Sequence, residues 1–179
     1  MGVGDLSLPL RVARAVGESP LSERVAAAQE LAYGPLIGWA RRSPFHTDVL
    51  GHSVHPPLTD LTLGFWASAA ILDVAGQPQD RHSAALLVAA GLVAAVPTAF
   101  SGTSDWAGMT GTERRIGAVH ALGTDAAVFL LLGSLIARTR GRHATGVWLG
   151  LAGNAVVAGA GFLGGHLALN RGTARRTAA

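Results

Sequence analysis

Four long apolar stretches dominate the chain after about residue 55. They cover residues 57–76, 83–103, 116–137 and 146–167, and short arginine-bearing stretches separate them. A helix that rises ~1.5 Å per residue needs about 20 apolar residues to cross a hydrocarbon core of ~30 Å, and each stretch is long enough. Helices of this apolarity would have no polar face to present to water. The pattern therefore predicts an all-α, four-helix transmembrane bundle within residues 46–170.

Upstream of the bundle, residues 1–45 show a different pattern. From Pro20 to about Tyr33, apolar positions alternate with charged ones, which predicts an amphipathic helix. Such a helix would either lie on the membrane surface, with Trp39 at the level of the lipid headgroups, or pack on the loops of its own bundle. The residues before Pro20 carry no clear pattern, and residues 171–179 form an arginine-rich tail.

Composition supports a membrane protein and removes several functional classes. Only 14% of the residues are charged, against about 25% in a typical soluble domain. The chain has no cysteine, which excludes disulfides, iron–sulfur ligation and cysteine nucleophiles within it. All fourteen basic residues are arginine and are spread over the loops and both ends, so they indicate anionic lipid headgroups and not nucleic acid as a partner. Nucleotide-binding and hydrolase motifs are missing from any usable context.

The arginines also predict an orientation in the plasma membrane. Four crossings place both ends of the chain on one side, which would carry seven arginines near the membrane against four on the other side. The positive-inside rule then predicts that both termini are cytoplasmic, although the arginine-rich loop near residue 140 argues the other way. The two groups are Arg41, Arg42, Arg114, Arg115, Arg171, Arg175 and Arg176, and Arg81, Arg138, Arg140 and Arg142.

The first and third apolar stretches open with the same motif. Sliding the chain by 65 residues sets residues 54–60 over residues 119–125, and both read V-H-x-x-x-T-D. The economical interpretation is a duplicated two-helix hairpin, whose copies are related by an axis along the membrane normal. The polar ends of both copies would then lie at one membrane face.

Most of the histidines fall at that face. His55 and His120 belong to the repeated motif, His166 closes the fourth stretch, and His46 and His52 lie just upstream of the first. Imidazoles from neighbouring helices can ligate a metal ion or the iron of a b-type haem. We therefore predict a haem b or metal site formed by His55, His120 and His166, with His46 and His52 as further candidate metal ligands. The alternative is that each histidine is an interfacial anchor or helix cap.

Asp60 and Asp125 are the other candidate cofactor-binding residues. Each lies about 7 Å deeper along its helix than the histidine of its own repeat, at ~1.5 Å per residue. A carboxylate at the centre of a spanning segment costs about 2.5–3.5 kcal/mol, so it normally faces a partner or a wet cavity. It could orient a histidine, carry protons or form a structural hydrogen bond. Asp73, at the far end of the first helix, is expected to be a solvated group near a loop.

Glycine is concentrated in the fourth stretch. It includes G-x-x-x-G at 146/150 and at 161/165, a pattern that lets two helix backbones approach closely. The motifs would serve either packing within the bundle or a homo-oligomer.

These motifs resemble the bacterial membrane-protein family known as domain of unknown function 2231. The resemblance covers about residues 45–170 and implies a four-helix membrane domain without a settled activity. In some relatives this domain is joined to a Rieske-type or cytochrome-type redox module, which favours electron transfer as the role of the histidines. The polar aromatic residues that often follow the family's Gly-Gly-x-Leu motif are replaced here. This puts in doubt a ligand or partner contact that those residues would supply. The matching segments are Gly51–Asp60, Gly64-Phe65-Trp66, Leu72-Asp73, Ala95–Ala99 with Asp105-Trp106, Arg115-Ile116-Gly117 with His120, and Gly161–Leu167, and the replaced residues are Ala168-Leu169-Asn170.

Two functions follow. The first is a redox-associated membrane subunit with a haem or metal site, which would work with a redox protein or a membrane complex. The second is a non-catalytic membrane anchor or assembly partner with structural histidines and aspartates. A proton or ion pathway ranks third, because between Asp125 and Arg138 the third helix offers only Ser134 as a polar group.

Overall fold

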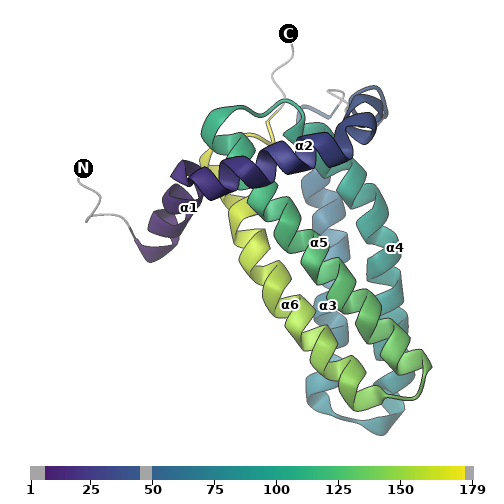
Figure 1. The fold of residues 1–179 in the computed structure, drawn as a ribbon. Coiled ribbons are helices and arrows are strands. Elements are labelled where there is room, and N and C mark those ends of the chain that lie inside the picture. The colour runs from purple at the N-terminus through teal and green to yellow at the C-terminus, as the bar shows by residue number, and fades with distance from the viewer. Residues whose placement is uncertain (1–6, 45–49, 176–179) are drawn as a thin grey trace.

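The computed structural model describes residues 7–44 and 50–175 as a bundle of α-helices (Figure 1). The all-α fold predicted from the sequence is confirmed. The helices are α1 (Leu8–Glu18), α2 (Pro20–Ala40), α3 (His55–Ala75), α4 (Arg81–Trp106), α5 (Gly111–Thr139) and α6 (His143–Gly165), with a 3₁₀ turn η2 (Pro78–Asp80) before α4 and a π-helical turn η3 (His166–Asn170) after α6.

Helices α3 to α6, extended by η2 and η3, are the four candidate spans among the described residues. Each corresponds to one predicted apolar stretch and is longer than it at one end or both. Helix α3 starts at His55 because Pro56 and Pro57 fall in its first turn, where the missing N–H groups would have no helical partner. It ends at Gly76, whose φ of 71° is a left-handed conformation that glycine adopts at little cost.

The four spans form two tandem hairpins, as the repeat predicts. Helix α3 packs mainly on α4, and α5 packs mainly on α6. Across the hairpins, α4 contacts α5 and α6 contacts α3, so α3 and α5 face each other diagonally (Figure 1). Buried positions on these two helices are related by the 65-residue offset of the repeat. They are Thr62, Trp66 and Ala69 in α3, and Ala127, Leu131 and Ser134 in α5.

Glycines on the second helix of each hairpin make room for these axial side chains. A Cβ atom added at Gly91 would lie 2.2 Å from Nε1 of Trp66, and one at Gly153 would lie 2.9 Å from Cγ of Leu131. Gly146 also faces α5 from inside the bundle, whereas a Cβ at Gly161 would meet no described atom within 4 Å. The motif at 146/150 therefore serves internal packing.

Helices α1 and α2 cross the end of the bundle at which α3 begins (Figure 1). Helix α2 packs on α5 and α4, and α1 packs on α5. Helix α2 thus packs on helices of its own bundle and not on the loops, and its place at the membrane surface stays a prediction. Helix α1 was not predicted, although Ala13, Val16 and Gly17 follow one another at helical spacing and form the face that packs on α5.

The prediction that Asp73 is solvated is wrong. Its side chain is 5% exposed and accepts two hydrogen bonds from Arg138, whose side chain is 2% exposed. Arg138 lies in the last turn of α5, which is why the sequence placed it with the loop arginines. Its side chain turns back into the bundle, where Nε also donates to Ser134 Oγ at 3.1 Å.

Candidate functional site

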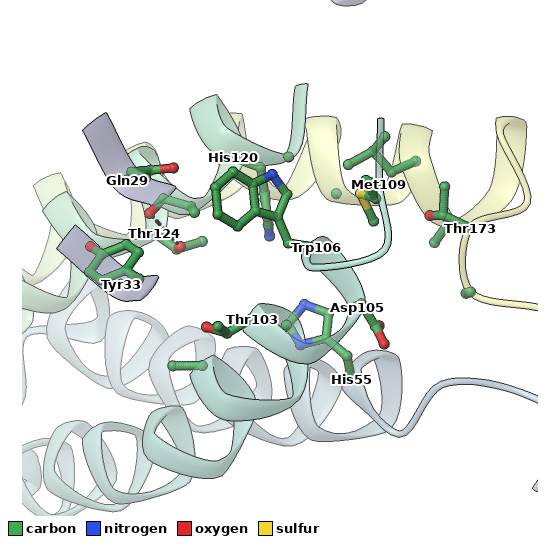
Figure 2. Close-up of a pocket in the computed structure, with 18 of the residues that line it drawn as sticks. Gln29, Tyr33, His55, Thr103, Asp105, Trp106, Met109, His120, Thr124 and Thr173 are labelled. Carbon is green, nitrogen blue, oxygen red and sulfur yellow. Dashed lines mark hydrogen bonds between the residues drawn. The ribbon is translucent and has the colours of Figure 1, made fainter. Parts of the chain in front are cut away.

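A cavity of about 230 Å³ lies at the end of the bundle that α2 crosses (Figure 2). Helices α2 to α6 all contribute to its wall, together with the segment after η3. The wall is mostly apolar and is rich in small side chains, which leave the backbones of the helices close to the cavity. The small residues are Ala99, Gly102, Gly117, Ala121, Gly164, Ala168 and Ala174.

His55 and His120 face each other in this cavity. Their ring centroids are 6.3 Å apart and their planes are inclined by 81°. His55 is the first residue of α3, and His120 lies in the third turn of α5. Figure 2 shows the two rings reaching toward one another from opposite sides, with Trp106 beside them. The structure thus brings together the two histidines of the repeated motif.

Each ring is held by a backbone carbonyl of the helix that follows its own. His55 Nδ1–H donates to Thr98 O at 3.0 Å, and His120 Nδ1–H donates to Ala160 O at 2.8 Å. A carbonyl oxygen can only accept, so these bonds place the proton on Nδ1 of both rings. Each neutral ring then carries a lone pair on Nε2. In His55 this atom lies 3.5 Å from the Thr59 hydroxyl, which donates to the backbone carbonyl of His55 at 2.9 Å.

Two glycines provide the space for the rings. A Cβ at Gly102 would lie 2.8 Å from Cε1 of His55, and a Cβ at Gly164 would lie 2.8 Å from Cε1 of His120. In both hairpins the glycine comes four residues after the carbonyl that holds the ring. The same arrangement of histidine, carbonyl and glycine therefore occurs twice, which supports the duplication.

The two aspartates of the repeat have different surroundings. Asp125 lines the cavity and accepts a hydrogen bond from the Tyr33 hydroxyl at 2.8 Å. This bond and partial burial raise the pKa of Tyr33 to about 12. Asp60 is exposed and does not line the cavity. The difference arises because α2 covers the side of the bundle formed by α4 and α5 and leaves Asp60 uncovered.

The other predicted histidines lie apart from this pair. His166 begins η3, next to the Phe162 ring, and is not part of the cavity wall. His52 is exposed and its Nδ1 pairs with the carbonyl of Ser53. His46 lies outside the described residues. Within residues 7–44 and 50–175, no three His, Cys, Asp or Glu side chains are grouped so as to hold a metal ion.

Ser53 and Asp105 are site residues that the predicted ligand set omitted. The Ser53 hydroxyl accepts a hydrogen bond from the backbone N–H of His55 at 3.0 Å and donates to the carboxylate of Asp105. Asp105 itself lines the cavity from the end of α4. These bonds tie the start of α3 to the end of α4 and so fix the position of His55.

Helix α2 supplies a wall that sequence reasoning also missed. Gln29, Tyr33 and Leu36 line the cavity, and their spacing of four and then three residues places them on one face of the helix. That spacing was a usable signal. The signal was missed because Gln29 in this stripe is polar and the segment was interpreted as a surface helix.

A family model described as a predicted membrane protein (DUF2231) matches residues 51–176. The chain belongs to this family. No curated protein and no solved structure matches the chain. In this DUF2231 protein the matched region includes both histidine–carbonyl–glycine arrangements, whereas α1 and α2 lie before it. Gln29 and Tyr33 are therefore contributions to the cavity from outside the matched region.

Proposed function

We propose that this membrane protein is a redox-associated subunit that holds one b-type haem between His55 and His120. The geometry of the pair is the observation that carries the proposal. His55 and His120 would hold the iron, because their rings face each other in the cavity with centroids 6.3 Å apart. Histidines that ligate metals also usually donate their other N–H to a carbonyl or carboxylate, as both rings do here.

The donor set fits haem better than a bare metal ion. Two imidazoles supply two ligands, whereas a structural zinc ion takes four from the protein. In a haem held by this pair, the macrocycle would supply the remaining ligands of the iron. A bound haem would supply one-electron chemistry, and the protein would bind it and orient it.

The walls of the cavity suit a flat ligand, because small residues face it from α4, α5 and α6. Its volume of about 230 Å³ is below the ~300–1,000 Å³ of typical ligand sites. Trp106 packs tightly against α5, since a Cβ at Gly117 would lie 2.6 Å from its Cδ1. With the ligand bound, Trp106 and α2 would cover it and exclude water.

The visible absorption spectrum of the purified full-length protein tests this function. When the cells are supplied with iron and haem precursor, we expect a b-type spectrum that changes on reduction. His55→Ala and His120→Ala should each lose it, while His166→Ala, which alters a histidine outside the cavity, should retain it. A wild-type protein that binds no haem, either in cells or on addition of haemin, would rule the proposal out.

A membrane anchor or assembly partner is the second candidate, and one observation favours it. Each Nδ1–H bond joins the two helices of a hairpin, so the histidines could serve stability alone. His120→Asn separates the two candidates because the Asn amide N–H can replace Nδ1–H but leaves no ligand in place of Nε2. The anchor predicts that His120→Asn keeps its stability and its complexes in a protein that binds no haem.

We also propose that both ends of the chain are cytoplasmic. The burial of Arg138 inside the bundle removes one arginine from the opposite side, which strengthens the arginine asymmetry. Because the chain has no native cysteine, single cysteines can report the orientation. In intact cells, an impermeant thiol reagent should label Gln77→Cys in the α3–α4 loop and not Thr110→Cys in the α4–α5 loop. The reverse labelling would contradict this orientation.

A further inference from the structure

The side chain of Gln29 is buried at the cavity without a protein partner. It is 8% exposed, and neither its Oε1 nor its Nε2 has a hydrogen-bond partner among the described residues. Figure 2 shows it projecting from α2 at the edge of the cavity, on the same side as Tyr33. A buried amide that is left unpaired costs about 1–3 kcal/mol, so Gln29 would gain from a polar group of a ligand bound in the cavity.

Other polar groups in this part of the wall are already engaged. The Tyr33 hydroxyl donates to Asp125, and the Thr124 hydroxyl donates to the carbonyl of Ala121 at 2.8 Å. Gln29 makes no hydrogen bond to Asp125 or to any other described residue. Gln29 therefore offers an N–H donor to whatever lies in the cavity.

We propose that Gln29 is a positioning residue that donates a hydrogen bond from Nε2 to a propionate carboxylate of the bound haem. This inference rests on the proposed function. A haem is apolar except for its iron and its two propionates, and carboxylates are costly in the interior of a membrane. Trp66 and Leu131, each eleven residues after the histidine of its helix, belong to one buried apolar cluster. Helix α2 lies across the end of the bundle (Figure 1). The propionate edge should therefore face α2.

Replacing Gln29 should consequently have opposite effects on the two states of the protein. Gln29→Met keeps an unbranched side chain of similar length and removes the unpaired amide. It should raise the unfolding temperature of the haem-free protein and weaken the binding of haemin. A residue that only shaped the cavity would not move the two measurements in opposite directions.

Two iron porphyrins make the test specific. Haemin carries propionates, while iron octaethylporphyrin has the same iron and macrocycle and no carboxylate. Each is titrated into the haem-free full-length protein in detergent. Gln29→Met is expected to weaken haemin binding roughly ten- to a hundredfold, the range for a hydrogen bond to a charged group, and to leave binding of the octaethyl compound unchanged. Gln77→Met, in an exposed loop outside this cavity, is the matched control and should change neither affinity.

The outcomes are distinct. Unchanged haemin binding by Gln29→Met, or equal weakening for both porphyrins, would overturn the role of Gln29 and leave the proposed function standing. A wild-type protein that binds neither porphyrin would overturn both. Gln29→Leu, measured in the same way, guards against a defect peculiar to the methionine variant.

Discussion

Asp73 and Arg138 form a bidentate ion pair between α3 and α5, with Nη1–Oδ1 and Nη2–Oδ2 distances of 2.9 and 2.5 Å. The two residues are 65 positions apart, the separation that also relates His55 to His120. Both pairs therefore lie near the axis between the two hairpins. One end of this axis carries two facing imidazoles, and the other carries opposite charges that hold the hairpins together.

The ion pair is expected to respond very differently to single and double replacement. Asp73→Asn leaves the buried guanidinium of Arg138 without a counter-charge, so it should lower the free energy of unfolding by about 3–5 kcal/mol. Asp73→Leu combined with Arg138→Met should recover most of that loss, because apolar pairs of similar volume often replace buried ion pairs without a penalty. Denaturant unfolding in a fixed detergent measures both.

An exposed ion pair provides the control for this comparison. Arg14 and Glu18 form an i,i+4 pair on α1, with side chains about half exposed. Glu18→Ala should therefore cost less than about 1 kcal/mol. If Asp73→Asn cost no more than Glu18→Ala, the interpretation of Asp73 as a buried counter-charge would be wrong.

Alanine at Gly102 or Gly164 should damage the histidine pair. Each new Cβ would come within 2.8 Å of an imidazole carbon, so the ring must move from its carbonyl acceptor. We expect each substitution to cost about 1–3 kcal/mol of stability, the usual range for overpacking. Under the proposed function, each should also reduce haem absorbance. Gly161→Ala, at a site with no described atom near the added Cβ, should be neutral or slightly stabilising. Gly102→Ala and Gly164→Ala behaving like this control would mean that the rings are not confined.

The helices and the central pair could be predicted from the sequence because they depend on local pattern. Apolar length located the four spans, and the repeated motif placed His55 and His120 at one membrane face. The prediction that His166 lies at the same membrane face did not determine whether its side chain lines the cavity. Gly164 faces His120, and His166 comes two residues later. At 3.6 residues per turn, His166 therefore lies about 200° around the helix from Gly164. Helical phase gives a physical reason for its place outside the cavity.

Contacts between residues that are distant in the sequence could not be predicted in the same way. Asp73 was assigned to solvent because a residue near a helix end has no local signal for its partner, and Arg138 is distant in the sequence. Asp60 and Asp125 have identical neighbours in the motif, yet only Asp125 meets Tyr33. The two aspartates differ because α2 packs on α4 and α5. The hydrophobic periodicity of each segment predicts a helix there but does not specify which helices pack together.

Tyr33 is expected to ionise at unusually high pH. It is the chain's only tyrosine, so the ultraviolet absorbance of phenolate reports this residue alone. Its pKa is raised to about 12 by the hydrogen bond to Asp125, by partial burial and by the nearby negative charge. Because the folded-state pKa lies above the ordinary ~10, the bond contributes fully to stability below about pH 10 and loses that contribution as the pH rises through about 12.

Substitution of the partner checks this cause. In Asp125→Asn the acceptor is no longer charged, and the midpoint of the Tyr33 titration should move back toward ~10. Asp60→Asn, the same change at the exposed member of the repeat, should leave the midpoint unaltered. A wild-type midpoint near 10 would show that Tyr33 does not donate to Asp125.

Acid is expected to loosen α2 from the bundle. Arg114 on α5 pairs with Glu30 at 2.6 Å and with Glu23 at 2.7 Å. Hydrogen bonds from its guanidinium lower the pKa of both carboxyl groups below the ordinary value of 4.5. Because the folded-state pKa values are depressed, the ion pairs contribute above about pH 4.5 and are lost as the pH falls through the lowered values. The contacts of α2 with α5 should therefore weaken in acid, and α2 should move away from the cavity.

Spin labels can follow this movement because the chain has no native cysteine. One label at Leu31→Cys, which is exposed on α2, and one at Gln77→Cys, in the α3–α4 loop, should give a narrow distance distribution at pH 7. The distribution should broaden below about pH 4, and Glu30→Gln should broaden it already at pH 7. Glu18→Gln removes a carboxylate that pairs within α1 and should leave it narrow. If the distribution in Glu30→Gln matched that of the wild type at every pH, the ion pairs with Arg114 would not be what holds α2 over the cavity.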